Sequence, residues 1–204
     1  MLGLPKNTEL NKQLPKKAIY AKFQMNTAAR DKIDSDIARI AIVNEVSPTR
    51  VNIASGEKVT GFYVLLVTLK KRDFDEKNII TLSKLIPQKM VMVLEYDNQA
   101  KLVVFHTKLM QSEWVEKEKL SLELKGLNLD TVWENIIVQI GGLTVEQGHS
   151  LDEQIIIDEQ RNKLQKEIAR LEKLARAEKQ PKKKFEIVQQ IKLMKYQNLF
   201  EKKR

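Results

Sequence analysis

The chain has 204 residues, a formal net charge of +9 and no cysteine. The missing cysteine excludes disulfides, thiolate zinc sites and cysteine nucleophiles, and the length allows one domain of ordinary size with an appendage. No apolar run approaches the roughly 20 residues of a membrane-spanning helix. The opening apolar stretch is too short, and is followed too soon by a charge, to be a signal peptide. We therefore expect a cytoplasmic protein with no membrane partner.

The positive charge is concentrated at the two ends of the chain. Residues 1–30 contain six Lys or Arg and one acidic residue, residues 31–149 contain 15 and 17, and residues 150–204 contain 15 and nine. This segregation favours a slightly acidic folded body with basic extensions that face solvent, a partner or phosphates.

The first basic extension is expected to be an arm of the main domain. Pro15 is suited to the first turn of a short helix, and Lys12, Lys16 and Lys17 form a cluster around it. Two interpretations of this cluster stay open: a solvated face of a packing arm, and a contact site for phosphate or a partner.

The next residues are expected to form a helix and a pair of strands. Ala29, Ile33, Ile37 and Ile40 recur at helical spacing and predict the inner face of a helix. Further along, the sequence predicts two strands, residues 42–46 and 50–53, that are bent at a proline between them.

A strand, a helix and a hairpin form the centre of the predicted fold. Residues 60–70 are apolar on both faces of a strand, as in a central strand that is covered on both sides. Asp73 is expected to cap the helix that follows, and residues 89–96 and 102–108 are predicted to pair around a turn at Asp97. Because a crossover helix joins parallel strands in a right-handed connection, we expect an α+β fold whose mixed β-sheet has covering helices.

Two more segments complete the main domain, which is predicted to span residues 1–148. Leu120, Leu122 and Leu124 alternate with polar residues and predict a half-exposed strand. Asp130 is expected to cap a helix that buries Trp133 and ends at a pair of glycines.

Residues 149–204 are predicted to be a basic helical extension. Ser150 opens its first helix with a capping box. About three heptads follow, and they predict a coiled-coil seam formed by Ile157, Leu164, Ile168 and Leu171.

A proline then separates the two helices of the extension. The second helix carries an apolar row formed by Phe185, Val188, Ile191 and Leu199. We expect a helical hairpin that exposes one stripe to a partner, and pairing with a second copy of the chain is the alternative. Candidate contacts to nucleic acid or to the partner are Lys182, Lys183 and Lys184.

The sequence offers one candidate catalytic constellation. It has no His–Glu metal motif, no phosphate-binding loop with Lys-Ser/Thr and no dinucleotide fingerprint. Magnesium-dependent nucleases of the restriction type place an acidic residue near one strand end and a Glu-x-Lys on a neighbouring strand, where carboxylates bind Mg²⁺. Asp97, Glu123 and Lys125 would supply these groups. The competing interpretation is a protein with no catalytic residues, metal or cofactor.

Several short segments carry a family resemblance. They are Leu2-Gly-Leu-Pro-Lys-Asn-Thr-Glu9, Leu14-Pro-Lys-Lys17, Asn44-Glu-Val-Ser-Pro-Thr-Arg-Val-Asn-Ile53, Leu82-Ser-Lys-Leu-Ile-Pro87 and His106-Thr-Lys108. Together they resemble a bacterial family that is known as a domain of unknown function (four-three-nine-one), over roughly residues 1–200. The resemblance supplies no catalytic residues.

The resemblance implies an association with DNA methyltransferases and helicase-like ATPases of restriction and phage-defence systems. We therefore expect a non-enzymatic accessory or scaffold subunit of a bacterial DNA restriction, modification or phage-defence assembly. Residues 149–204 would bind a helicase-like ATPase or a DNA methyltransferase, or the DNA backbone. A general nucleic-acid binder is ranked last, because no aromatic residues alternate with the lysines.

Overall fold

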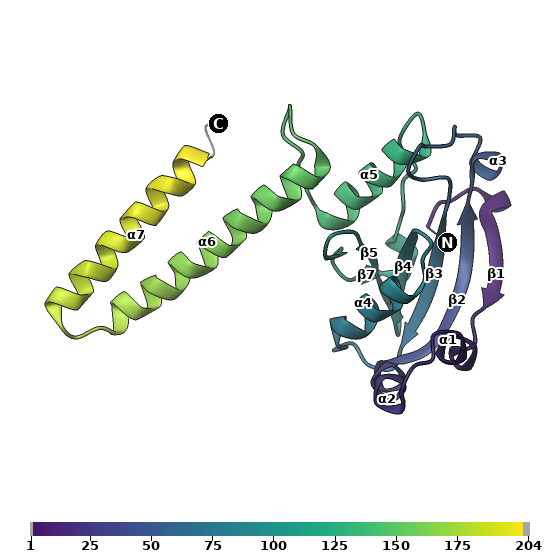
Figure 1. The fold of residues 1–204 in the computed structure, drawn as a ribbon, viewed down its shortest axis with the longest axis horizontal. Helices are drawn as coiled ribbons and strands as arrows, with labels where there is room; N and C mark the ends of the chain where they lie inside the picture. Colours follow the sequence, from purple (N-terminus) through teal and green to yellow (C-terminus); the bar gives the residue numbers. More distant parts are fainter. Residues whose placement is uncertain (1, 202–204) are drawn as a thin grey trace. The chain divides into compact units, whose positions relative to one another are not determined.

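The computed structural model describes the chain from Leu2 to Glu201, with side chains as far as Tyr196. The chain forms two compact units, and the boundary between them lies between Leu143 and Thr144. The first unit holds a β-sheet, and the second unit is helical (Figure 1). Within the described chain, no helix is long and apolar enough to cross a membrane.

The first unit has the predicted α+β fold with a mixed sheet. Its strands follow the hydrogen-bonded order β1-β2-β3-β4-β5-β6, and β7 pairs with β5. Strands β3 and β4 are parallel, whereas the other pairs are antiparallel. The strand bounds are β1 Glu9–Gln13, β2 Ile37–Val46, β3 Phe62–Leu69, β4 Met90–Tyr96, β5 Gln99–Phe105, β6 Leu109–Gln111 and β7 Val115–Glu116.

Among the described residues, five helices and two short 3-10 turns belong to the first unit with the sheet, and two longer helices make up the second unit. The first unit contains the short 3-10 turns η1 (Lys6–Thr8) and η2 (Lys117–Lys119), and the helices α1 Lys16–Lys22, α2 Thr27–Asp36, α3 Pro48–Val51, α4 Glu76–Leu85 and α5 Leu129–Gly141. The second unit contains α6 Leu151–Ala177 and α7 Pro181–Glu201.

Strand β3 is the centre of the sheet and is covered on both faces. Leu65 and Val67 belong to the hydrophobic core formed with α1, α2 and α4. Phe62 points to the opposite face, since successive side chains of a strand alternate. There its ring lies 5.3 Å from that of Trp133 in α5, measured between centroids. The expected double coverage of this strand is therefore confirmed.

The predicted crossover between β3 and β4 is also confirmed, with a different cap. Helix α4 begins one residue after Asp75, whose side chain accepts a hydrogen bond from the backbone N–H of Lys77. The sequence had favoured Asp73 for this role. Parallel pairing places Val64 beside Val91, so the two apolar strands share both of their covered faces.

The helix predicted to extend through Ile40 is shorter in the structure. Helix α2 ends at Asp36, and Ile37 begins β2. Ile37 pairs with Leu69 of β3, and Ile40 pairs with Val67. Helical spacing alone was ambiguous here, because pairing with the central strand buries the same isoleucines equally well.

Two other predicted strands are absent from the described structure. Residues 48–51 form α3, with Pro48 in its first turn, where the missing N–H of proline costs no hydrogen bond. The segment around Leu122 keeps the predicted alternation of burial, but it forms one isolated bridge, between Ser121 and Leu2, instead of a ladder.

A buried carboxylate joins three elements beside this core. Asp36 is 1% exposed, and it accepts hydrogen bonds from the backbone N–H of Asp75 at 2.8 Å and from the side-chain amide of Asn78. The Lys71 ammonium lies 2.9 Å away. Burial opposes ionisation of Asp36, but these donors outweigh it and hold its pKa below the usual range.

Replacement of Asp36 by Ala is expected to destabilise the first unit by about 3 kcal/mol, because it breaks a buried charged network and leaves one of the two N–H donors of the Asn78 amide without an acceptor, while the other still donates to the Lys32 carbonyl oxygen. Urea unfolding measures this change. The matched control is Asp73→Ala, which alters an exposed carboxylate in the same loop and should change stability by less than about 0.5 kcal/mol. Equal effects of the two substitutions would contradict the network.

A second carboxylate fixes the loop that leads into β3. Asp130 accepts hydrogen bonds from three consecutive backbone N–H groups: Glu57 at 2.7 Å, Lys58 at 3.1 Å and Val59 at 2.7 Å. Gly56 leaves no room for a Cβ beside this carboxylate. Burial opposes ionisation, but the three donors prevail and lower the pKa of Asp130. Its predicted role as the α5 N-cap belongs instead to Asn128.

The lowered pKa of Asp130 predicts a specific pH dependence. The folded state holds its proton less tightly than the unfolded state, so the stabilisation is present above the ordinary Asp pKa of about 3.9 and is lost as the pH falls below it. We expect Asp130→Asn to reduce the slope of unfolding free energy against pH between about pH 5 and 3. Chemical unfolding at a series of pH values tests this, and an unchanged slope would contradict it.

Candidate functional site

The second unit is a helical hairpin, and its sequence specifies where the hairpin begins. Ser150 accepts a hydrogen bond from the backbone N–H of Glu153, while the Glu153 carboxylate accepts from the Ser150 backbone at 2.8 Å. This confirms the predicted capping box. The backbone and hydroxyl donors of Ser150 lower the pKa of Glu153, and a negative charge in the first turn also complements the helix dipole.

An apolar row on each helix holds the hairpin together. Ile168, Leu171 and Ala175 of α6 are buried in one cluster with Ile191 of α7. Leu164 and three residues of α7 pack against this cluster, namely Ile187, Val188 and Met194. Three of the four predicted seam residues therefore pack within the chain. The fourth, Ile157, is half-buried and lies outside this cluster.

One ion pair also joins the two helices. The Lys195 ammonium lies 2.8 Å from a carboxylate oxygen of Glu172, and this hydrogen bond lowers the pKa of Glu172. Both groups are partly exposed, so water screens the pair. The apolar cluster therefore carries most of the stability of the hairpin.

The bend between the helices carries a dense group of cations, here called the basic tip. Residues 173–184 contain six Lys or Arg and one Glu. All six cations are exposed, and none of them forms an ion pair within the described residues. They are Lys173, Arg176, Lys179, Lys182, Lys183 and Lys184. The last three were predicted from the sequence as contact residues, whereas Lys173, Arg176 and Lys179, which precede Pro181, were not.

The last three cations of the basic tip lie where helix electrostatics disfavour them. Lys182, Lys183 and Lys184 follow Pro181 in the first turn of α7, which contains no acidic residue. The N-terminal end of a helix carries partial positive charge, so cations there are unfavourable in isolation. An anionic partner would relieve this repulsion, which makes the basic tip a surface suited to phosphates or carboxylates.

Helix α7 also has an exposed apolar stripe. Phe185 is 62% exposed, Leu193 65% and Tyr196 62%. Their spacing of eight and three residues places them on one side of the helix, opposite the buried row. Phe185 had been assigned to the inner row with Val188 and Ile191, but a period of 3.6 residues carries it to the outside. Leu199, the last residue of that row, lies outside the described side chains.

The N-terminal lysines have different surroundings. Lys16 forms an ion pair with Asp34 and donates a hydrogen bond to the carbonyl oxygen of Ile37 at 2.8 Å. Its hydrogen bond is the main cause of the lowered pKa of Asp34. Lys16 therefore holds α1 against the α2–β2 junction, while Lys12 and Lys17 are exposed.

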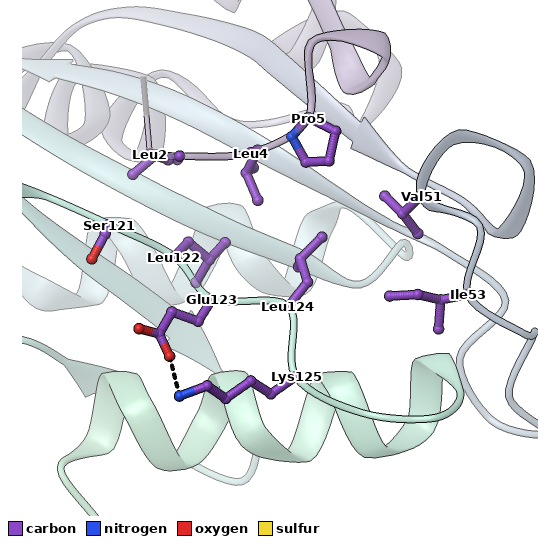
Figure 2. A pocket seen from close by; sticks show the side chains of 11 residues that line it. Leu2, Leu4, Pro5, Val51, Ile53, Ser121, Leu122, Glu123, Leu124 and Lys125 are labelled. Carbon is purple, nitrogen blue, oxygen red and sulfur yellow. Dashed lines mark ion pairs between the residues drawn. The ribbon is translucent and has the colours of Figure 1, made fainter.

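The three residues of the predicted nuclease constellation are divided between two places. Glu123 and Lys125 pair with each other in the loop before α5, beside an apolar groove of about 470 Å³ (Figure 2). Asp97 lies in the β4–β5 turn with a positive φ of 51°, and it does not line this groove. Within residues 2–201, no three His, Cys, Asp or Glu side chains gather as a metal-binding group.

Comparison with known families identifies the chain's relatives. The model of a family described as Domain of unknown function (DUF4391) matches residues 2–197. The chain belongs to this family. Its match spans both units, so the hairpin is part of the DUF4391 pattern together with the sheet. No curated protein and no solved structure matches the chain.

In this DUF4391 chain, α6 contains one buried and one exposed leucine, and substitution of each tests how the hairpin packs. Leu171→Ala is expected to destabilise the hairpin by about 2–3 kcal/mol, because Leu171 is 5% exposed and its truncation leaves a cavity. Leu174→Ala is the control, since Leu174 is 45% exposed. Hydrogen exchange of α7 amides measures the effect. Comparable loss of protection in both variants would contradict the packing described for the hairpin.

Proposed function

We propose that this protein is a non-enzymatic accessory or scaffold subunit of a bacterial DNA restriction, modification or phage-defence assembly. In this proposal the sheet unit is a rigid body, and the hairpin binds a helicase-like ATPase or a DNA methyltransferase. The basic tip contacts the DNA backbone. The partner class comes from the family resemblance, whereas the binding surfaces come from the hairpin itself.

The observation that carries the proposal is the apolar surface of α7 that remains exposed after α7 packs on α6. The inner side of this helix packs on α6 through Ile191. Its outer side exposes Phe185 next to the basic tip, and Leu193 and Tyr196 further along the helix. Aromatic residues are enriched at the centre of protein interfaces, with charged residues around them. The apolar stripe would therefore bind protein.

The basic tip suits a different ligand, the phosphates of a nucleic-acid backbone. Lysine neutralises phosphate as a point charge on a flexible chain, without reading the base sequence. The tip would therefore add affinity and orient the assembly on DNA, while sequence recognition would belong to the partner.

Replacement of Lys182, Lys183 and Lys184 by Gln is expected to weaken DNA binding independently of sequence. The slope of log K against log salt concentration should decrease by about one for each lysine that contacts a phosphate. Fluorescence anisotropy with short duplexes at several salt concentrations measures it. The matched control replaces Lys6, Lys77 and Lys119 by Gln. These lysines are exposed in the first unit, and their replacement removes the same amount of charge. Identical slopes for both triple variants would contradict the role of the basic tip.

Replacement of Phe185 and Tyr196 by Ser is expected to abolish binding of the protein partner and leave DNA binding intact. Affinity capture from native cells after nuclease treatment, read by mass spectrometry, measures this. The wild-type protein should retain a stoichiometric helicase-like ATPase or DNA methyltransferase. The control is Ile156→Ser, which alters a side chain that is 55% exposed on α6. Recovery of nucleic acid alone with the wild-type protein would overturn the proposal.

A further inference from the structure

A polar cavity in the first unit has no role in the proposed function. It has a volume of about 270 Å³ and lies where α4 leads into β4 and where β5 ends. Lys84 and Gln88 line it from the α4 side, Lys89 from the start of β4, Phe105 and His106 from the end of β5, and Trp133 from α5. The cavity therefore joins segments that are distant in sequence.

The charged side chains among the described residues that line this cavity are all positive. Lys84 and Lys89 contribute two ammonium groups, and no Asp or Glu is among the residues that line it. Neither lysine forms an ion pair with a carboxylate of the described chain. Two cations around one small cavity favour an anion, and a low-dielectric wall strengthens that preference.

Aromatic rings position both ammonium groups. The Lys84 nitrogen lies 5.3 Å from the centroid of the Phe105 ring, and the Lys89 nitrogen lies 5.7 Å from that of Trp133. Contacts of this kind favour a cation near the ring face. Each lysine therefore lies against a different aromatic ring of the cavity wall, although both lysine side chains are largely exposed.

Trp133 supplies a second, independent observation. The residue is 3% exposed, and its indole nitrogen Nε1 finds no hydrogen-bond acceptor among the described residues. Buried N–H donors in proteins nearly always have an acceptor. Trp133 borders this cavity, and it lines neither the groove beside Glu123 and Lys125 nor the one beside Asn135 and Val138. The unsatisfied donor therefore belongs to a residue of the cavity wall.

We propose that this cavity binds a phosphate group between Lys84 and Lys89. A phosphate dianion matches the two ammonium groups in charge and offers several acceptor oxygens for the surrounding donors. The volume lies just below the range of about 300–1,000 Å³ that is typical for drug-sized ligands. It admits free phosphate or a small phosphomonoester with its phosphate innermost. The site depends on the sheet unit alone and is separate from the basic tip.

Intrinsic fluorescence of the full chain tests this assignment. The chain has two tryptophans, so Trp114→Phe makes Trp133 the sole reporter beside the cavity. Inorganic phosphate and adenosine monophosphate are titrated separately, and sodium acetate at matched ionic strength controls for screening. A saturable change with the phosphate probes and none with acetate is expected. Tighter binding of the nucleotide would assign the attached group to the site, and equal affinity would assign phosphate alone.

Two lysine variants then locate the binding. Lys84→Gln and Lys89→Gln should each raise the Kd for phosphate by about tenfold, because each removes one charged donor. Lys77→Gln, an exposed lysine at the other end of α4, should leave it unchanged. Thermal unfolding without ligand verifies that all three variants fold, and added phosphate should raise the Tm of the wild type more than that of either cavity variant. A linear response, an equal response to acetate, or unchanged affinity in both cavity variants would overturn the assignment.

Discussion

Burial of β3 on both faces is the constraint on which the first unit depends. A strand hydrogen-bonded on both edges and apolar on both sides requires a covering layer on each face, and α4 and α5 provide these layers with different parts of the sequence. The crossover through α4 follows from this requirement, because it brings β4 parallel to β3. Carboxylates then fix the loops at the edges: Asp36 joins α2 to the start of α4, and Asp130 joins α5 to the loop before β3.

The two units use several of their charged and apolar side chains differently. In the first unit, Lys16, Asp36 and Asp130 all have internal partners, so their charges contribute to the fold. In the hairpin, one row of apolar residues on α7 is buried while the stripe at Phe185 remains exposed, and the lysines after Pro181 oppose the helix dipole. Features that work against isolated stability are typical of surfaces with a binding role.

The sequence correctly predicted the elements whose residue pattern fits only one type of secondary structure. The doubly apolar run at β3 and the capping box at Ser150 occur as expected. The hairpin turns at Asp97 as predicted, but its second strand spans Gln99–Phe105 instead of residues 102–108. The prediction was wrong for Ile37 and Ile40, because their spacing suits a helix while pairing with β3 decides their structure. Phe185 was misplaced because small differences in helical phase move a residue from the inner to the outer side. The cavity near Trp133 had no sequence signal, since its walls come from separate elements.

We propose that the hairpin, rather than the sheet unit, binds the partner. Cross-linking mass spectrometry of the assembly captured from native cells, with a lysine-specific reagent, tests it most directly. Cross-links to the partner should concentrate on Lys184, Lys192 and Lys195, the exposed lysines that adjoin Phe185, Leu193 and Tyr196 in the chain. Cross-links confined to exposed lysines of the sheet unit, such as Lys77 and Lys119, would contradict it.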